Sequence, residues 1–156
     1  MDLGSPHDWQ YLAEGGANIV LSYTGPTASL RRHVLRLRKR SRHQKKKLDS
    51  SEAEISRDPA VLFYETFVKH ALPDVAASLR EVSLPLDFLR QGWPHWQAAR
   101  PDKRKSAQGD DCDVDLDRPL AVLAENMVQS PDSSHRVLAV EIKVQLSFFV
   151  LAVCFP

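Results

Sequence analysis

Hydrophobic residues in the first third of the chain recur at the spacing of β-strands. The segments W-Q-Y-L from Trp9 and I-V-L-S-Y from Ile19 flank the stretch E-G-G-A-N, which predicts a hairpin with a glycine turn. After a T-G-P breaker, a third strand is predicted over His33 to Leu37. We therefore expect three antiparallel strands, followed by an exposed, charged insertion over residues 38–56.

The middle of the chain carries a helical period. Asp58 and Pro59 supply a capping residue and a first-turn proline, and apolar residues then recur at helical spacing until Leu72. This pattern predicts a helix whose apolar face packs on the sheet. Shorter helices are predicted over residues 73–80 and 85–91.

The last third combines a polar stretch with two apolar runs. Residues 92–117 are rich in proline, charge and small side chains, which predicts a long connecting loop anchored by Trp93 and Trp96. Apolar runs over 119–127 and 136–144 are flanked by turn-forming residues. We expect them to be paired strands that close the sheet.

Together these patterns predict one α+β domain, with helices packed on a twisted, mainly antiparallel sheet of about five strands. The domain is expected over residues 9–143, after an N-terminal tail of residues 1–8. Residues 38–56 and 97–117 are expected to be flexible insertions, and residues 144–156 an apolar tail. A chain of 156 residues with 43% hydrophobic residues can cover a single core but not two.

Charges nearly cancel over the chain but are segregated along it. The net charge is +1, from 21 basic and 20 acidic residues, which argues against a nucleic-acid binder. The stretch from Arg31 to Lys47 contains no acid. Its basic run from Arg36 to Lys47 could be a nuclear-localisation or nucleic-acid patch, but it lacks interleaved aromatic residues, and we expect a solvated loop. The stretch D-D-C-D-V-D-L-D from Asp110 to Asp117 lacks the glycine and terminal glutamate of a calcium loop. An acidic loop without a metal site is therefore predicted there.

Several classes of protein are disfavoured by what the sequence lacks. Cys112 and Cys154 show no spacing of a zinc site or a disulfide framework. The N-terminus has no signal-peptide pattern, and no apolar stretch reaches the roughly 18 to 20 residues that span a bilayer. We expect a monomer in the nucleus or cytoplasm that contacts neither membrane nor nucleic acid.

The glycine turn is the first candidate for chemistry. At Gly15 and Gly16 the missing side chains let backbone N–H groups face a phosphate, and the Asn18 amide can donate one more hydrogen bond. Gly-Gly turns are also common in plain hairpins, and neither the Walker pattern nor the protein-kinase glycine pattern is present. The turn alone leaves both interpretations open.

Arg36 is the second candidate. It ends V-L-R in the predicted third strand, about 20 residues after the turn, where protein kinases hold the lysine that pairs with nucleotide phosphates. An arginine can do this through its fork of donors, although an outward-facing strand arginine explains the residue equally well. The run V-E-I-K that ends at Lys143 follows the turn by more than 120 residues, so it cannot be that strand.

Four motifs taken in order resemble one family. They are W-x-Y-x-x-E-G-G-A-N-x-V-L-x-Y from Trp9, V-L-R from Val34, F-V-K-H from Phe67 and A-V-E-I-K from Ala139. The residues of these motifs, their order and their spacing resemble those of the inositol-pentakisphosphate 2-kinases. The resemblance covers roughly residues 9–143.

The resemblance implies an ATP-dependent phosphotransferase. Its substrates would be ATP and inositol pentakisphosphate, and the γ-phosphate would pass to the 2-hydroxyl to give inositol hexakisphosphate, or phytate. The implied fold has two lobes and is distantly related to protein kinases, and this chain resembles the first lobe. The Mg²⁺ ligands are expected in the second lobe.

The resemblance also implies roles for individual residues. Lys143 matches a lysine that meets phosphates at the reaction centre, so it is expected to be catalytic and to bind substrate, and Arg104 aligns with an inositol-phosphate-binding arginine. A set of seven residues is expected to bind ATP. The phosphate loop corresponds to Gly15, Gly16 and Asn18, the phosphate-pairing arginine to Arg36, the strand leading to the adenine to Glu125 and Asn126, and a further nucleotide contact to Glu141.

The resemblance ends after Lys143. The family continues E-I-K-P-K, whereas this chain has Gln145 at the second lysine and then an apolar run. Our hypothesis is that residues 144–156 are intron-derived or frameshifted sequence, and we expect this chain to be inactive alone. The alternative is a non-catalytic module that binds a polyphosphate or a protein through the basic segment 31–47.

Overall fold

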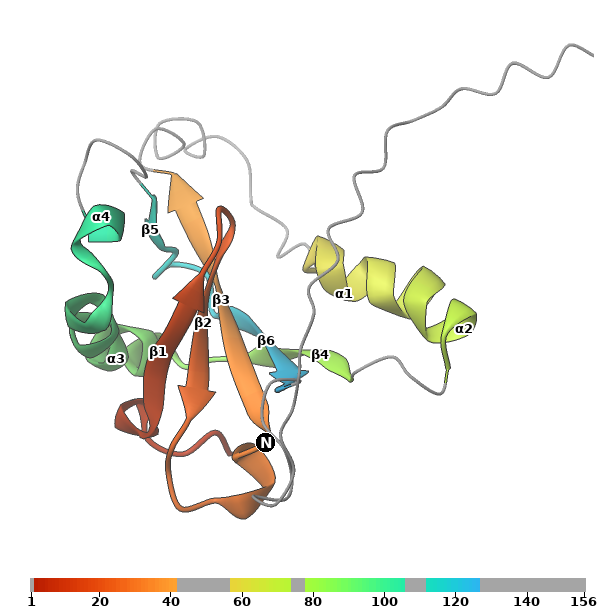
Figure 1. Cartoon of the computed structure of the whole chain (residues 1–156), viewed down its shortest axis with the longest axis horizontal. Coiled ribbons are helices and arrows are strands. Elements are labelled where there is room, and N and C mark those ends of the chain that lie inside the picture. The colour runs from red at the N-terminus through yellow and green to blue at the C-terminus, as the bar shows by residue number, and fades with distance from the viewer. Residues whose placement is uncertain (1, 42–56, 74–77, 106–111, 127–156) are drawn as a thin grey trace, which may run out of the picture.

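The computed structural model describes residues 2–41, 57–73, 78–105 and 112–126. They form an α+β fold around one antiparallel sheet (Figure 1). The strands run in the order β1-β2-β3-β6-β4, and a short strand, β5, pairs with β3 off this path. Their bounds are Trp9–Glu14 for β1, Asn18–Tyr23 for β2, His33–Ser41 for β3, Leu79–Ser83 for β4, Cys112–Val114 for β5 and Leu120–Glu125 for β6.

The predicted hairpin and third strand are confirmed. Strands β1 and β2 pair antiparallel across the glycine turn, and β3 pairs with β2 and with β6. The third strand is longer than predicted, because Lys39 pairs with Val114 of β5 and the strand ends only at Ser41. The prediction of an exposed insertion is therefore wrong for residues 38–41, and residues 42–56 lie outside the described part of the chain.

The helix predicted to begin at Pro59 is present, but its packing is not as predicted. Asp58 caps it, since its Oδ1 accepts a hydrogen bond from the Ala60 N–H at 2.8 Å. It runs as α1 (Pro59–Phe63), a π-helical turn (Tyr64–Val68) and α2 (Lys69–Ala71).

Only the first turn of this helix meets the sheet. Val61 is fully buried, whereas the other large apolar side chains are about half exposed, and the helix projects away from β4 (Figure 1). The exposed residues are Leu62, Phe63, Phe67 and Leu72. The prediction that an apolar face of the whole helix covers the sheet is wrong.

Two further predictions between residues 73 and 117 are wrong. The helix predicted over 73–80 is wrong at its end, because Leu79 begins β4 and pairs with Ala124 of β6. The loop predicted over 92–117 is wrong in large part, because α3 (Leu86–Ala99) extends through it and α4 (Asp102–Lys105) follows. The proline inside α3 concealed a helical period that the buried residues reveal: Phe88, Leu89, Gly92 and Trp96.

The strand predicted over 119–127 is confirmed as β6, and the strand predicted over 136–144 lies outside the described residues. The acidic stretch was predicted to be a loop, yet residues 112–114 form β5. Residues 97–117, predicted to be a flexible insertion, therefore contain the end of α3, all of α4 and β5.

The two faces of the sheet have different environments. Helices α3 and α4 lie on one face, and α1 lies on the other (Figure 1). The core fills the space under α3, where Trp96 donates its indole N–H to the Trp9 carbonyl at 2.8 Å. The largest fully buried members of this core are Trp9, Trp96, Ile19, Leu21, Leu30, Leu35, Leu37, Leu84, Leu89 and Leu123. Among the described residues, the element that covers the opposite face is α1, which lies near β4.

Gly92 is required by the packing of Trp96. A Cβ at Gly92 would clash with the indole ring of Trp96, which is fully buried. We expect Gly92→Ala to lower the free energy of unfolding by about 1–3 kcal/mol, as overpacked core positions do. Urea unfolding of the full chain measures this.

Gly16→Ala is the matched control, because a Cβ there would meet nothing within 4 Å. Equal unfolding midpoints for the two variants would contradict the prediction.

Candidate functional site

The glycine turn between β1 and β2 has open space above it. It is closed by a hydrogen bond from the Gly15 N–H to the Asn18 carbonyl at 3.0 Å. Neither Gly15 nor Gly16 has a positive φ, and a Cβ on either would meet nothing within 4 Å. A turn that needs glycine for its backbone would show positive φ values. Neither conformation nor internal packing therefore explains why these residues are glycines.

The register of the strands brings Asn18 and Arg36 to the same face. Asn18 pairs with Arg38, and Arg36 pairs with Val20 of β2 and Val122 of β6. Side chains on paired residues share a face, and alternate residues along a strand do so too. Asn18, Arg36 and Arg38 therefore lie on the face opposite α3.

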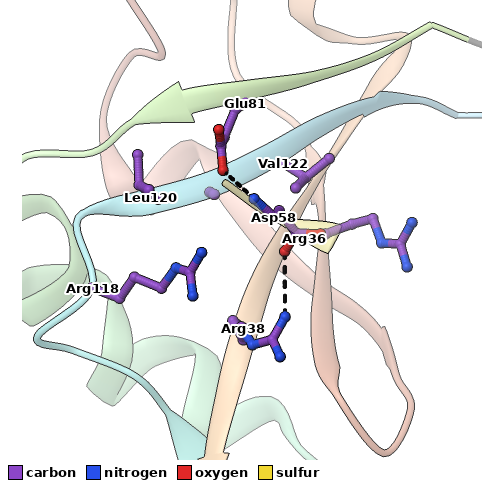
Figure 2. A pocket seen from close by; sticks show the side chains of 8 residues that line it. Arg36, Arg38, Asp58, Glu81, Arg118, Leu120 and Val122 are labelled. Atoms are coloured by element: carbon purple, nitrogen blue, oxygen red, sulfur yellow. Dashed lines mark hydrogen bonds and ion pairs between the residues drawn. The ribbon is translucent and has the colours of Figure 1, made fainter. Parts of the chain in front are cut away.

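A shallow pocket is formed on this face, where β3 meets β6 and the start of α1 (Figure 2). It is a surface hollow that encloses no space of its own, so it marks where these side chains meet and is not a preformed cavity. Its lining consists of Arg36, Arg38, Asp58, Glu81, Arg118, Leu120, Ala121 and Val122.

The acidic residues Asp58 and Glu81 line one side of the pocket. The Asp58 carboxylate lies 3.6 Å from Arg38, and the Asp58 N–H donates to Glu81 Oε1 at 2.7 Å. In Figure 2 Asp58 lies between Glu81 and Arg38, whereas Arg36 extends away from this group. The capping residue of α1 thus also neutralises one of the pocket's arginines.

Arg36 differs from the other cations of its strand. Its side chain makes no hydrogen bond or ion pair with any residue in the part of the chain that the structure describes. The neighbouring cations meet carboxylates within 4 Å. These pairs are Arg32 with Glu125, Arg38 with Asp58, Lys39 with Glu14, and Arg40 with Asp115 and Asp117. Arg36 is therefore available to an anion from outside the described residues.

The two residues predicted to precede the adenine lie at the other end of the same strands. Glu125 pairs with His33 at the start of β3 and forms a surface ion pair with Arg32 at 3.4 Å. Asn126 follows it, buried, and its N–H donates to the Arg32 carbonyl at 2.7 Å. These residues and the glycine turn thus lie at opposite ends of the sheet.

Glu14, the first residue of E-G-G-A-N, faces the α3 side. Its carboxylate is 1% exposed and makes two bonds to the Arg100 guanidinium, at 2.6 Å to Nε and 3.1 Å to Nη2. Lys39 Nζ lies 3.6 Å from the same carboxylate and donates to the Gly15 carbonyl at 3.1 Å. A buried ion cluster therefore lies directly beneath the turn.

Arg104, predicted to bind the inositol phosphate, lies on α4 beside this cluster. Its Nε is 3.9 Å from Glu14, and its side chain is 38% exposed. It is thus on the α3 side of the hairpin, away from Arg36. Nearby, burial raises the pKa of the Tyr11 phenol above its ordinary value; Glu14 adds to this effect, while Arg100 and Arg104 oppose it.

Two predicted site residues, Glu141 and Lys143, lie outside the described residues. Within the described ranges, no group of three or more His, Cys, Asp and Glu side chains is arranged to hold a metal ion. None of the helices described combines the length and apolar character needed to cross a membrane.

Sequence reasoning missed the partners of Glu14. Lys39 carried a usable signal: it continues the alternation of Leu35 and Leu37, so a strand extended by two residues directs it into the core. A cation at a core position predicts a buried carboxylate partner. Arg100 carried no such signal, because it follows a helix that was predicted to be a loop.

This α+β domain carries, on the face that also holds Asn18 at the end of the glycine turn, an arginine that has no partner among the described residues. The family model of inositol-pentakisphosphate 2-kinase matches residues 11–150. The chain belongs to this family, which is a family of phosphotransferases.

Three fungal relatives are similar to the chain. The inositol-pentakisphosphate 2-kinases of two Cryptococcus neoformans var. neoformans serotype D strains, JEC21 and B-3501A, are each 32% identical over 144 residues, which is 92% of this chain and 33% of the relative. The enzyme of Debaryomyces hansenii is 33% identical over 87 residues, 56% of this chain and 21% of the relative. The chain thus spans about a third of the length of the Cryptococcus relatives.

Glu14 is in a buried ion pair and Glu125 in a partly exposed one, so their substitutions should lower the free energy of unfolding by different amounts. Glu14→Gln leaves the buried Arg100 without its counter-charge, and we expect a loss of about 3–5 kcal/mol in the free energy of unfolding. Glu125→Gln breaks a partly exposed pair, and we expect a loss below about 1 kcal/mol. Urea unfolding compares the two, and similar losses would show that Glu14 is not stabilised as described.

Proposed function

We propose that this chain is the ATP-binding part of an inositol-pentakisphosphate 2-kinase. The observation that carries the proposal is the state of Arg36, which points from the central strand without a partner among the described residues while its neighbours are neutralised. Family membership supplies the reaction class. The proposed reaction transfers the γ-phosphate of ATP to the 2-hydroxyl of inositol pentakisphosphate.

The glycine turn and Arg36 are suited to hold the triphosphate. An arginine offers parallel N–H donors that match phosphate oxygens, and its charge does not titrate in the physiological range. The Asn18 amide lies on the same face, two residues along the ladder from Arg36. Fixed donors of this kind offset the charge on the transferred phosphoryl group without rearranging.

The nucleotide would lie along β3 and β6. Arg38, beside the turn, is five positions along β3 from His33, which pairs with Glu125, a span of roughly 17 Å at the rise of an antiparallel strand. Because this number of positions is odd, the side chains of Arg38 and Glu125 point to opposite faces of the sheet. We assign the adenine to the Glu125–Asn126 end and the phosphates to the end with the glycine turn. Glu141 is proposed as a further nucleotide contact.

The inositol phosphate requires additional cations. Five phosphates need several fixed positive charges, and we propose Arg104 and Lys143 as two of them, with Lys143 at the reaction centre. The described residues do not supply a set of Mg²⁺ ligands, so we propose that Mg²⁺ is held by the part that corresponds to the remaining length of the relatives. On this proposal the chain binds ATP but does not complete catalysis alone.

The kinase proposal also covers the fold of the chain, its oligomeric state and its location in the cell. The hairpin, the cation on β3 and the capped helix after it agree with the first lobe of a kinase-like fold. We propose that the chain acts as a monomer in the nucleus or cytoplasm.

The alternative function is a binding module that uses the basic segment 31–47. The pairing of four of its cations with carboxylates disfavours that function, because neutralised cations attract a polyanion less strongly. The two functions differ in how many arginines of β3 they require.

Substitution of single arginines on β3 separates the two functions. We expect Arg36→Ala to weaken ATP binding by about 10- to 100-fold, because it removes charge-assisted hydrogen bonds. Arg40→Ala is the matched control, on the same strand and face but paired with Asp115 and Asp117. Isothermal titration of the full chain with ATP measures both. Equal losses in the two variants would support the basic-segment module.

The glycines can be tested apart from stability. Gly16→Ala should leave the thermal midpoint unchanged, since a Cβ there meets nothing within 4 Å, but it should weaken ATP binding because the methyl group occupies the approach of the phosphates. Gly4→Ala should do the reverse, since Gly4 has a φ of 70° and close neighbours far from the turn. Unchanged ATP affinity in Gly16→Ala would contradict the proposed role of the turn.

A further inference from the structure

Glu14 is a buried acid that the proposed binding of ATP does not use. It is the last residue of β1 and directly precedes the turn, yet its side chain faces away from Arg36 and is 1% exposed. A lone buried carboxylate is costly, so its retention requires partners with good geometry.

Arg100 meets this requirement and is itself held in place. Besides its two bonds to Glu14, its Nη2 donates to the Arg104 carbonyl at 2.9 Å, and its guanidinium lies over the Trp93 ring, 5.7 Å from the centroid. Its backbone N–H closes the end of α3 by donating to the Gln97 carbonyl at 3.2 Å. The Glu14 carboxylate is therefore bound to a guanidinium whose position at the junction of α3 and α4 is itself held by several contacts.

Lys39 extends the connection to the turn itself. Its Nζ, 1% exposed, reaches both the Glu14 carboxylate and the Gly15 carbonyl, and its backbone N–H donates to the Ala17 carbonyl at 2.8 Å. Lys39 thus holds the Gly15 end of the turn through its buried ammonium group and the Ala17 end through its backbone. One face of the turn is held from below while the other remains open.

We propose that Glu14 is a positioning residue that holds the glycine turn and α4 in a fixed relation to each other. A turn that receives phosphates through its backbone gains affinity when its shape is set before binding. Because Arg100 joins Glu14 to the Arg104 carbonyl, the same carboxylate also sets the place of the segment that carries Arg104. The effect on ATP rests on the proposed function, whereas the effect on the turn does not.

Conservative variants test this without removing the buried charge. Glu14→Asp keeps the carboxylate but withdraws it by one methylene, and Arg100→Lys keeps the cation but loses the fork. In both full-length variants we expect backbone amides of residues 15–17 and of α4 to exchange hydrogen about 10-fold faster, while those of β6 change little. We also expect ATP affinity to fall by about 10-fold.

Leu89→Val is the control, since Leu89 is a buried residue of α3 that lies outside the ion cluster. It should lower stability without selective exchange at the turn. The proposal is overturned if Glu14→Asp and Arg100→Lys behave like Leu89→Val, with lower stability but no selective change at residues 15–17. If the wild-type chain does not bind ATP, the proposed function fails, and the exchange measurement still decides the role of Glu14.

Discussion

The central strand β3 is the constraint on which the rest of the structure depends. It is paired on both sides, so its side chains must alternate strictly between two faces. Leu35 and Leu37 enter the core beneath α3, and Arg36 and Arg38 are directed to the other face. A register shift of one residue would exchange these sets, bury the arginines and expose the leucines. The burial of Leu35 and Leu37 in the core therefore also fixes the face of the sheet to which Arg36 and Arg38 point.

Ion pairs account for most of the described cations in and next to β3. Arg38, Lys39 and Arg40 of β3 pair with acids from three separate parts of the chain, the start of α1, the end of β1 and the residues after β5. Arg32, just before β3, pairs with Glu125 at the end of β6. This distribution leaves Arg36 as the Lys or Arg residue of β3 that has no partner among the described residues. Within the described part of the basic run, Arg36 is thereby set apart from the cations on either side of it. The near-zero net charge of the chain agrees with this arrangement.

Much of the fold could be predicted from local pattern, and the errors have identifiable causes. The hairpin, the strand with Arg36, β6 and the cap at Asp58 follow from period-two alternation and from local chemistry. Strand β4 was mistaken for a helix because its identity depends on pairing with β6, about 40 positions later in the chain. Helix α3 was mistaken for a loop because a proline interrupts its pattern, whereas Trp96 and the sheet beneath it hold the helix together.

The sequence by itself determined the family, the glycine turn and the placement of Arg36 on the third strand, because these depend on residues close together in the chain. The structure brings Asn18 and Arg36 to one face and separates them from Arg104, which no local pattern indicates. It also decided that Glu14 is buried against Arg100, 86 positions away, and that Arg32, Arg38, Lys39 and Arg40 pair with carboxylates. The physical reason is that an ion pair depends on distance in space, and that distance is set only when the sheet and α3 pack together.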